Sequence, residues 1–161
     1  MSDERAATST RPHPGPPAAS LPAVMLQRLI DHARAEYPNE GCGVIIGDRA
    51  AADGGRPLRW EPCRNKAASP YRYEIDPDDL LRLTIETDDR GETFWAIVHS
   101  HTHTPARPSP TDIGLALYHD ALYVLVSLAE AEADASSGMP SVRAFRIVDG
   151  VVHDVELLVG E

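Results

Sequence analysis

Three histidines fall within five residues of the chain, in a Val-His-Ser-His-Thr-His segment that ends at His103. If a strand continues through His101, then His99 and His101 project to the same face, because side chains alternate along a strand. Two imidazoles on one face can bind a single zinc ion, whose bonds to imidazole nitrogen are about 2.0–2.1 Å long. The alternative is a pair of surface histidines without a role, since this spacing also occurs away from metal sites.

An acidic residue that can complete such a site follows the histidines across a proline-rich loop. Ser109, Pro110 and Asp112 are together typical of an ordinary helix start, with serine at the N-cap and proline at the first helical position. The segment Asp76-Pro77-Asp78-Asp79 has the same design. Beside two histidines, however, the Asp112 carboxylate is well placed as a third ligand. Two histidines and one carboxylate leave the fourth zinc position open to water, which is the arrangement of a catalytic site.

Hydrolysis at such a site also needs a base that takes a proton from water and later delivers it to the leaving amine. The candidate is Glu40, in the segment Pro38-Asn39-Glu40-Gly41-Cys42-Gly43 between an expected helix and an expected buried strand. A glycine-flanked turn there can aim its carboxylate into a cleft. In isolation Glu40 is an ordinary exposed glutamate, because this residue type lies mostly at the surface.

His103 and the two cysteines are further candidates for chemistry. His103 would share the face of the other two histidines only if the strand ran on, but Thr104-Pro105 indicates that a loop has begun, so we expect His103 to be a bystander. Cys42 as a thiol nucleophile would leave the histidine, serine and aspartate spacing unused, and a free cysteine is more often a small buried hydrophobe. Cys42 and Cys63 are too few for a disulfide framework, and whether they pair or approach the metal stays open.

Hydrophobic periodicity and turn residues predict the elements that must position these side chains. The first strands and helices alternate, and a hairpin that turns at Asp149-Gly150 closes the chain. We therefore expect an α/β or α+β domain of three layers, with a mixed β-sheet flanked by helices. The expected helices run from Val24 to Tyr37, from Asp76 through Ile85 and from Pro110 to Tyr118, and the expected strands are Gly43–Gly47, Leu58–Cys63, Tyr71–Ile75, Thr93–His99, Tyr123–Leu128 as the central strand, Val142–Val148 and Val151–Val159.

Length and composition indicate one globular domain, since the chain has 161 residues, of which 42% are hydrophobic and 25% are charged. Residues 1–20 are rich in proline and contain no large aliphatic side chain after Met1, so we expect a disordered tail there and a folded domain over residues 21–161. The net charge of −10 excludes nucleic acid and anionic membranes as first-choice partners. Without an apolar export signal or a long apolar span, we expect a cytoplasmic protein.

The candidate residues together resemble a known family. Glu40 lies upstream, His99-Ser100-His101 is followed after seven residues by Ser109, and Asp112 follows after two more. This arrangement resembles the complete signature of the JAMM (MPN+) metalloproteases. Other segments, among them Asn65-Lys66-Ala67-Ala68-Ser69-Pro70, Tyr73-Glu74-Ile75-Asp76 and Tyr123-Val124-Leu125-Val126-Ser127, resemble the short actinobacterial branch of the family. The resemblance covers roughly residues 21–158.

The resemblance implies an MPN/JAMM-type domain and a role for each motif residue. His99, His101 and Asp112 would bind Zn²⁺, Glu40 would be general base and then general acid, and Ser109 would hydrogen-bond the developing oxyanion. The implied substrate is a ubiquitin-like sulfur-carrier protein whose C-terminal Gly-Gly bears cysteine, and hydrolysis would release cysteine as a step of cysteine biosynthesis.

The sequence leaves two alternatives to this function. One is an isopeptidase that acts on another ubiquitin-like conjugate, although Ile113 to Leu122 leads directly to a strand and leaves no room for the insertion with which deubiquitinating relatives hold their modifier. The other is a non-catalytic scaffold, whose members typically lack the metal ligands. Lys66, which is the only lysine, and Arg107 are candidates for binding the substrate's cysteine carboxylate on charge alone.

Overall fold

The structure is a computed structural model that describes residues 15–161, and its centre is one mixed seven-stranded sheet. The strands are β1 (Ala18–Pro22), β2 (Cys42–Gly47), β3 (Pro57–Cys63), β4 (Thr93–His101), β5 (Leu122–Ser127), β6 (Ser141–Val148) and β7 (Val151–Gly160). Their order across the sheet is β1-β7-β6-β5-β4-β2-β3, so β5 is the central strand, as predicted. The pairs β1–β7 and β4–β5 are parallel, and the other neighbours are antiparallel.

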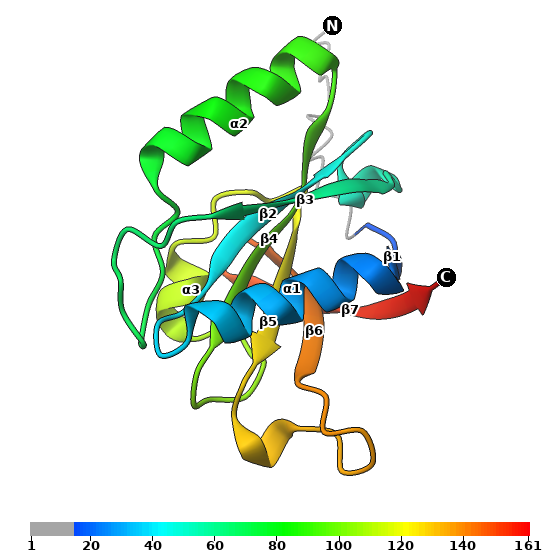
Figure 1. Cartoon of the computed structure of the whole chain (residues 1–161). Coiled ribbons are helices and arrows are strands. Elements are labelled where there is room, and N and C mark those ends of the chain that lie inside the picture. The colour runs from blue at the N-terminus through cyan, green and yellow to red at the C-terminus, as the bar shows by residue number, and fades with distance from the viewer. Residues whose placement is uncertain (1–14) are drawn as a thin grey trace, which may run out of the picture.

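Helices cover both faces of this sheet. Helix α1 (Ala23–Glu36) crosses one face, where Leu29 packs in the same core as Val98 of β4 (Figure 1). Helices α2 (Pro77–Arg90) and α3 (Pro110–Gly114) lie on the opposite face, where Leu83 and Ile113 pack with Ile97. Ile97 and Val98 are neighbours that point to opposite sides of the strand, which confirms the predicted three layers. None of the helices within residues 15–161 has the length and apolar character to cross a bilayer.

The helix and hairpin signals act in the structure as the sequence predicts. Asp76 caps α2, because its carboxylate accepts a hydrogen bond of 2.9 Å from the backbone N–H of Asp78. Gly91 ends the same helix in the left-handed conformation, at φ 64°. The β6–β7 hairpin turns at Asp149 and Gly150, whose φ values of 50° and 77° are those of a two-residue primed turn.

Strand β1 lies partly inside the predicted tail. Residues 18–20 pair with β7 in parallel register, while residues 1–14 of the predicted tail lie outside the described residues. Periodicity cannot reveal such a short strand, because it exists through the backbone groups that the β7 edge offers and through Leu21, which is completely buried. The ordered domain therefore begins before residue 21.

Two other predicted elements are wrong in extent or type. Residues 71–75 form no strand, since only an isolated bridge joins Ile75 to Asn65 and the side chain of Asn65 supplies the remaining partners of this segment. Helix α3 ends at Gly114 rather than at Tyr118, because the Tyr118 N–H bonds the Tyr123 hydroxyl and the chain already turns toward β5. Two η turns of single-turn 3₁₀ helix, η1 (Ala51–Asp53) and η2 (Glu130–Glu132), complete the elements.

Candidate metal centre

Strand β4 carries two histidines to one buried point at the edge of the α2/α3 face. The strand continues through His101, and in register His99 lies opposite Cys42 of β2 and Leu125 of β5. His99 and His101 are 1% and 6% exposed, and their Nε2 atoms are 3.2 Å apart. The period of two therefore brings both imidazoles together, as the sequence predicts.

A capping box on the short helix α3 aims Asp112 at these imidazoles. The Ser109 hydroxyl accepts a hydrogen bond from the Asp112 N–H at 3.1 Å, and the Ser109 N–H donates to Asp112 Oδ2 at 2.8 Å. The same Oδ2 lies 3.1 Å from Nε2 of His101 and 3.3 Å from Nε2 of His99. The structural and the chemical explanations of Ser109 and Asp112 are thus both correct for position: the cap is the device that places the carboxylate.

The three donor atoms fit a metal ion of the size and geometry of zinc. A tetrahedral ion with bonds of about 2.0–2.1 Å places neighbouring ligand atoms about 3.3 Å apart. The separations of 3.1–3.3 Å among His99, His101 and Asp112 are close to that value. The second nitrogen of His101, Nδ1, lies 2.8 Å from the Pro105 carbonyl, which favours a proton on Nδ1 and leaves Nε2 free to bind a metal.

The electrostatics of the three residues are those of a coupled buried cluster. Burial alone would raise the pKa of Asp112, but hydrogen bonds with His101 and His99 outweigh it and hold that pKa below its usual range. Burial lowers the pKa of His99, although Asp112 partly opposes the effect. Burial also acts to lower the pKa of His101, and the hydrogen bonds to Asp112 and Pro105 reverse the sign, so that its pKa is raised. The cluster therefore favours an ionised carboxylate beside its imidazoles.

Glu40 lies beside the same cluster, held by its backbone. One carboxylate oxygen of Glu40 lies within 4.8 Å of ligand atoms of His99 and His101. Its neighbour Gly41 is fastened to β4, because the Ser100 N–H donates to the Gly41 carbonyl at 2.9 Å and the Gly41 N–H donates to the Ser100 hydroxyl at 2.7 Å. Asp112 contacts both imidazoles more closely than Glu40 does, so we assign Asp112 as third ligand and leave Glu40 available for proton transfer.

The Glu40 carboxylate is buried and poised near neutrality. The residue is 3% exposed, and Oε2 has no hydrogen-bond partner among the described residues. Burial raises the pKa of Glu40 to about 7, while the neighbouring His101 lowers it and the Asp112 carboxylate raises it. A carboxyl group with that pKa can both accept and donate a proton near neutral pH.

Two residues of the loop between β3 and α2 belong to the site and were missed as site residues from the sequence. Asn65 is buried and its Nδ2 donates to the Glu40 carbonyl at 2.9 Å. The Tyr73 ring stacks on the His99 ring, with centroids 4.1 Å apart and planes at 18°. Burial raises the pKa of the Tyr73 hydroxyl well above its usual value, so this ring is neutral and acts by packing. Asparagine is a common turn residue, and that was its only local signal.

The remaining candidates lie away from the converging donor atoms. His103 is exposed in the loop after β4, where its ring packs edge-on against Tyr37 at 6.1 Å. Cys42 and Cys63 are both free and buried and face each other in register on β2 and β3. Burial raises the pKa of the Cys63 thiol to about 12 and that of Cys42 further still, so neither is a ready thiolate nucleophile.

A family model describing prokaryotic homologues of the JAB domain matches residues 22–147. The chain is 37% identical over 132 residues to the CysO-cysteine peptidase of Mycobacterium tuberculosis, covering 82% of this chain and 84% of that protein. It is 32% identical over 140 residues to a protein of Thermus thermophilus named a probable TtuB-protein conjugate cleaving protease, covering 86% and 81% of the two chains.

A solved structure also resembles the fold. The solution structure of a Desulfitobacterium hafniense protein matches with a TM-score of 0.73 at 30% sequence identity, covering 89% of this chain and 93% of that one. The similarity therefore extends over the sheet and the helices that surround the metal centre.

Proposed function

The chain belongs to the prokaryotic branch of the JAB (JAMM/MPN) domain family, and from this premise we propose that it is a zinc-dependent metallopeptidase. Its proposed reaction is hydrolysis of the bond between the C-terminal glycine of a ubiquitin-like sulfur-carrier protein and cysteine, with release of cysteine. The observation that carries the peptidase proposal is the convergence of three donor atoms at 3.1–3.3 Å beside the buried Glu40 carboxylate. The substrate proposal is supported by the 37% identity to the mycobacterial peptidase.

In this proposal, His99, His101 and Asp112 hold the zinc ion. When bound, zinc supplies Lewis acidity that activates water at neutral pH and polarises the scissile carbonyl. The fourth position stays open, because Glu40 is farther from the imidazoles than Asp112 and His103 lies in the exposed loop.

Glu40 moves the proton. Its Oε2 takes a proton from the attacking water as the new carbon–oxygen bond forms, and the same proton passes to the leaving nitrogen as the carbon–nitrogen bond breaks. A pKa of about 7 allows both transfers, since neither protonation state of Glu40 is strongly favoured. The products are a carrier with a free C-terminal carboxylate and an amino acid with a free amine.

Ser109 stabilises the charge that develops on the carbonyl oxygen. Its hydroxyl oxygen accepts the bond from the Asp112 N–H, which leaves its own O–H free to donate. A donor fixed before the reaction by a helix cap stabilises a developing oxyanion without reorganising.

A second candidate function is cleavage of an isopeptide bond between a ubiquitin-like protein and another protein. The 32% identity to the Thermus protein favours it. The proposed scaffold role, by contrast, has no support from a site in which every donor is present and converges.

The test uses zinc-loaded protein and two substrates made from one carrier that ends in Gly-Gly. One carries a C-terminal cysteine, and the other is joined to a lysine of a second protein, and mass spectrometry identifies the products. Cysteine release from the first alone supports the proposed function, cleavage of the second alone favours the isopeptidase, and cleavage of neither contradicts both. Zinc-loaded Glu40→Gln protein is the control, which should keep its zinc and release nothing.

A further inference from the structure

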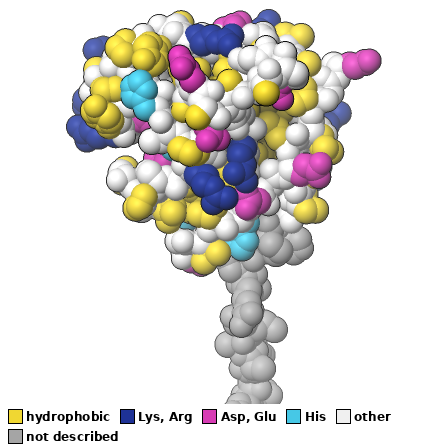
Figure 2. Space-filling model, turned by 90° about the horizontal axis from the view of Figure 1, so that it is seen from below, with side chains coloured by type: hydrophobic (Ala, Val, Ile, Leu, Met, Phe, Trp, Pro, Cys, Tyr) yellow, Lys and Arg dark blue, Asp and Glu magenta, His cyan; other side chains and the backbone are white. Residues whose placement is uncertain are grey.

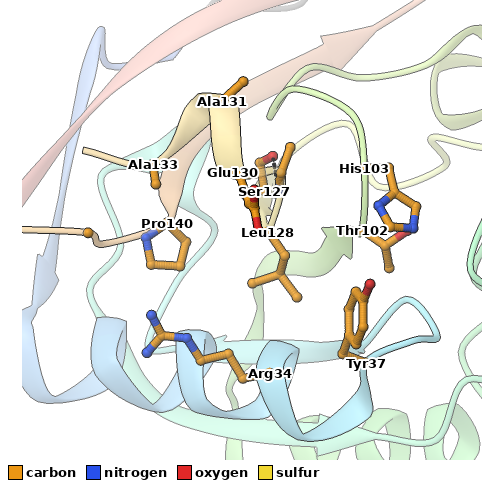
Figure 3. A pocket seen from close by; sticks show the side chains of 12 residues that line it. Arg34, Tyr37, Thr102, His103, Ser127, Leu128, Glu130, Ala131, Ala133 and Pro140 are labelled. Carbon is orange, nitrogen blue, oxygen red and sulfur yellow. Dashed lines mark hydrogen bonds between the residues drawn. The ribbon is translucent and has the colours of Figure 1, made fainter. Parts of the chain in front are cut away.

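A pocket of about 800 Å³ opens between the C-terminal half of α1 and the loop that joins β5 to β6. Figure 3 shows Tyr37 and His103 at one end of it and Arg34 at the other, below Ala133 and Pro140. The wall near the metal centre begins directly after the ligand His101, with Thr102 and His103. Thr102 is fixed in place, because its hydroxyl donates to the Pro70 carbonyl at 2.9 Å.

The pocket lies on the side where the proposed reaction releases its amine. Glu40 gives its proton to the leaving nitrogen, so the part of the substrate beyond the broken bond must lie next to Glu40. Tyr37, which lines the pocket, is three residues before Glu40, and its ring contacts His103, which is two residues after His101. The end of the pocket formed by Tyr37 and His103 is therefore close along the chain to both sides of the reacting centre.

The charged groups of the pocket favour an anion. Arg34 and His103 line it, and Glu130 is its one acidic lining residue within the part of the chain described. Arg34 forms no ion pair or side-chain hydrogen bond within residues 15–161. Figure 2 looks onto the lower end of the molecule, where Lys and Arg side chains stand among hydrophobic ones although the chain carries a net charge of −10.

We propose that this pocket binds the α-carboxylate of the amino acid that is released, with Arg34 as the ionic partner and His103 as a ring N–H donor. The guanidinium offers two parallel donors that match a carboxylate. The inference rests on the proposed function and deepens it. A terminal amino acid carries this carboxylate, whereas a lysine inside a conjugated protein does not, so the pocket selects a single terminal amino acid over an isopeptide.

The two basic residues selected from the sequence on charge alone lie elsewhere. Lys66 and Arg107 are exposed in loops, and neither lines this pocket. Arg34 was overlooked because it stands in the last turn of α1, where a basic residue is also expected to complement the helix dipole.

The experiment compares two adducts of one Gly-Gly carrier, one ending in cysteine and the other in cysteine amide, which lacks only the negative charge. The zinc-loaded protein should hydrolyse the acid with a kcat/KM about tenfold or more above that of the amide, since a hydrogen bond to a charged group commonly contributes a factor of that order. Arg34→Gln should lower kcat/KM for the acid by about the same factor, mainly through KM, and leave the amide unchanged. His103→Gln should have the same selective effect, to a smaller extent.

Arg28→Gln is the matched control, because Arg28 is exposed on another face of the same helix and the charge change is identical. It should leave both adducts unaffected. Equal hydrolysis of acid and amide by the unsubstituted protein would overturn the pocket's role while the proposed function stands. An Arg34→Gln effect that is the same on both adducts would also overturn it, and hydrolysis of neither adduct would overturn the proposed function together with the inference.

Discussion

The side-chain amide of Asn65 donates a hydrogen bond of 2.9 Å to the backbone carbonyl of Glu40, and both residues are buried. The same side chain also donates to the Arg72 carbonyl and accepts from the N–H groups of Ala67 and Glu74. One asparagine thus joins the segment that carries Glu40 to the loop that carries Tyr73, the residue stacked on His99. Asn65 is a positioning residue for Glu40, because it holds its backbone and not its carboxylate.

Asn65→Asp tests this link, because it keeps an acceptor for Ala67 and Glu74 and removes the donor to Glu40. We expect kcat to fall by about tenfold or more, with KM little changed and one zinc ion still bound per chain, since a small displacement of a catalytic group is costly. Zinc content by mass spectrometry and steady-state kinetics measure the two effects. Loss of zinc in parallel with activity would instead indicate general damage to the site.

Ser109→Ala separates catalysis from helix capping when it is compared with Asp76→Ala. Both residues are N-caps followed by proline, and loss of either cap should cost about 1 kcal/mol of stability. Only Ser109→Ala should lower kcat, by about 10²–10³-fold, because only Ser109 is a proposed oxyanion donor. Urea denaturation and turnover of the carrier adduct give the two readouts. Equal kcat values in the two variants would contradict the oxyanion role.

Removal of zinc should destabilise the protein, because a ligand that binds only the folded state adds stability in proportion to the logarithm of its saturation. At free zinc about 1,000 times the Kd, that contribution is about 4 kcal/mol. His99→Ala should abolish the rise of Tm on zinc addition. His103→Ala, two residues farther on and exposed, should keep it. The same zinc-dependent rise in both variants would show that His99 is not a ligand.

The raised pKa of Glu40 predicts a pH-dependent stability in the zinc-free protein. Between its ordinary pKa of 4.5 and its folded pKa of about 7, the folded chain keeps a proton that the unfolded chain loses. This contribution is complete below pH 4.5 and is lost as pH rises through 7, by up to about 1.4 kcal/mol per pH unit.

Glu40→Gln should remove that slope, because glutamine does not titrate. In urea denaturation with a chelator from pH 4.5 to 8, the variant should gain on the unsubstituted protein by on the order of 2–3 kcal/mol as pH rises. His99, His101 and Asp112 titrate in both proteins and largely cancel in the difference. Parallel stability curves would show that burial does not raise this pKa.

Local signals in the sequence predict most of the elements because those signals act locally. Proline at the first turn and Asp76 at the cap start α2, and Asp149-Gly150 closes the hairpin, without help from distant residues. The histidine pair follows from the alternation of a single strand. The order of the seven strands has no such signature, since it depends on which edges meet after folding.

Distant contacts explain what the sequence did not predict. Tyr73 lies in a segment whose β-like composition suggested a strand, yet no neighbouring strand pairs with it beyond the Asn65–Ile75 bridge. The roles of Asn65 and Arg34 depend on residues that are far away along the chain, Glu40 and the β5–β6 loop respectively. Residues with ordinary local roles, such as a turn asparagine or a helix-terminal arginine, give no sequence signal for such contacts.

The short strand β1 also protects the molecule from its own sheet. It covers the outer edge of β7 along five register pairs, from Ala18 with Glu156 to Pro22 with Gly160. A chain trimmed to the matched range 22–147 would lose β1 and β7 together and leave β6 as a bare edge, to which a second chain can add a strand. Such a fragment would retain every residue of the metal centre and still be prone to aggregate.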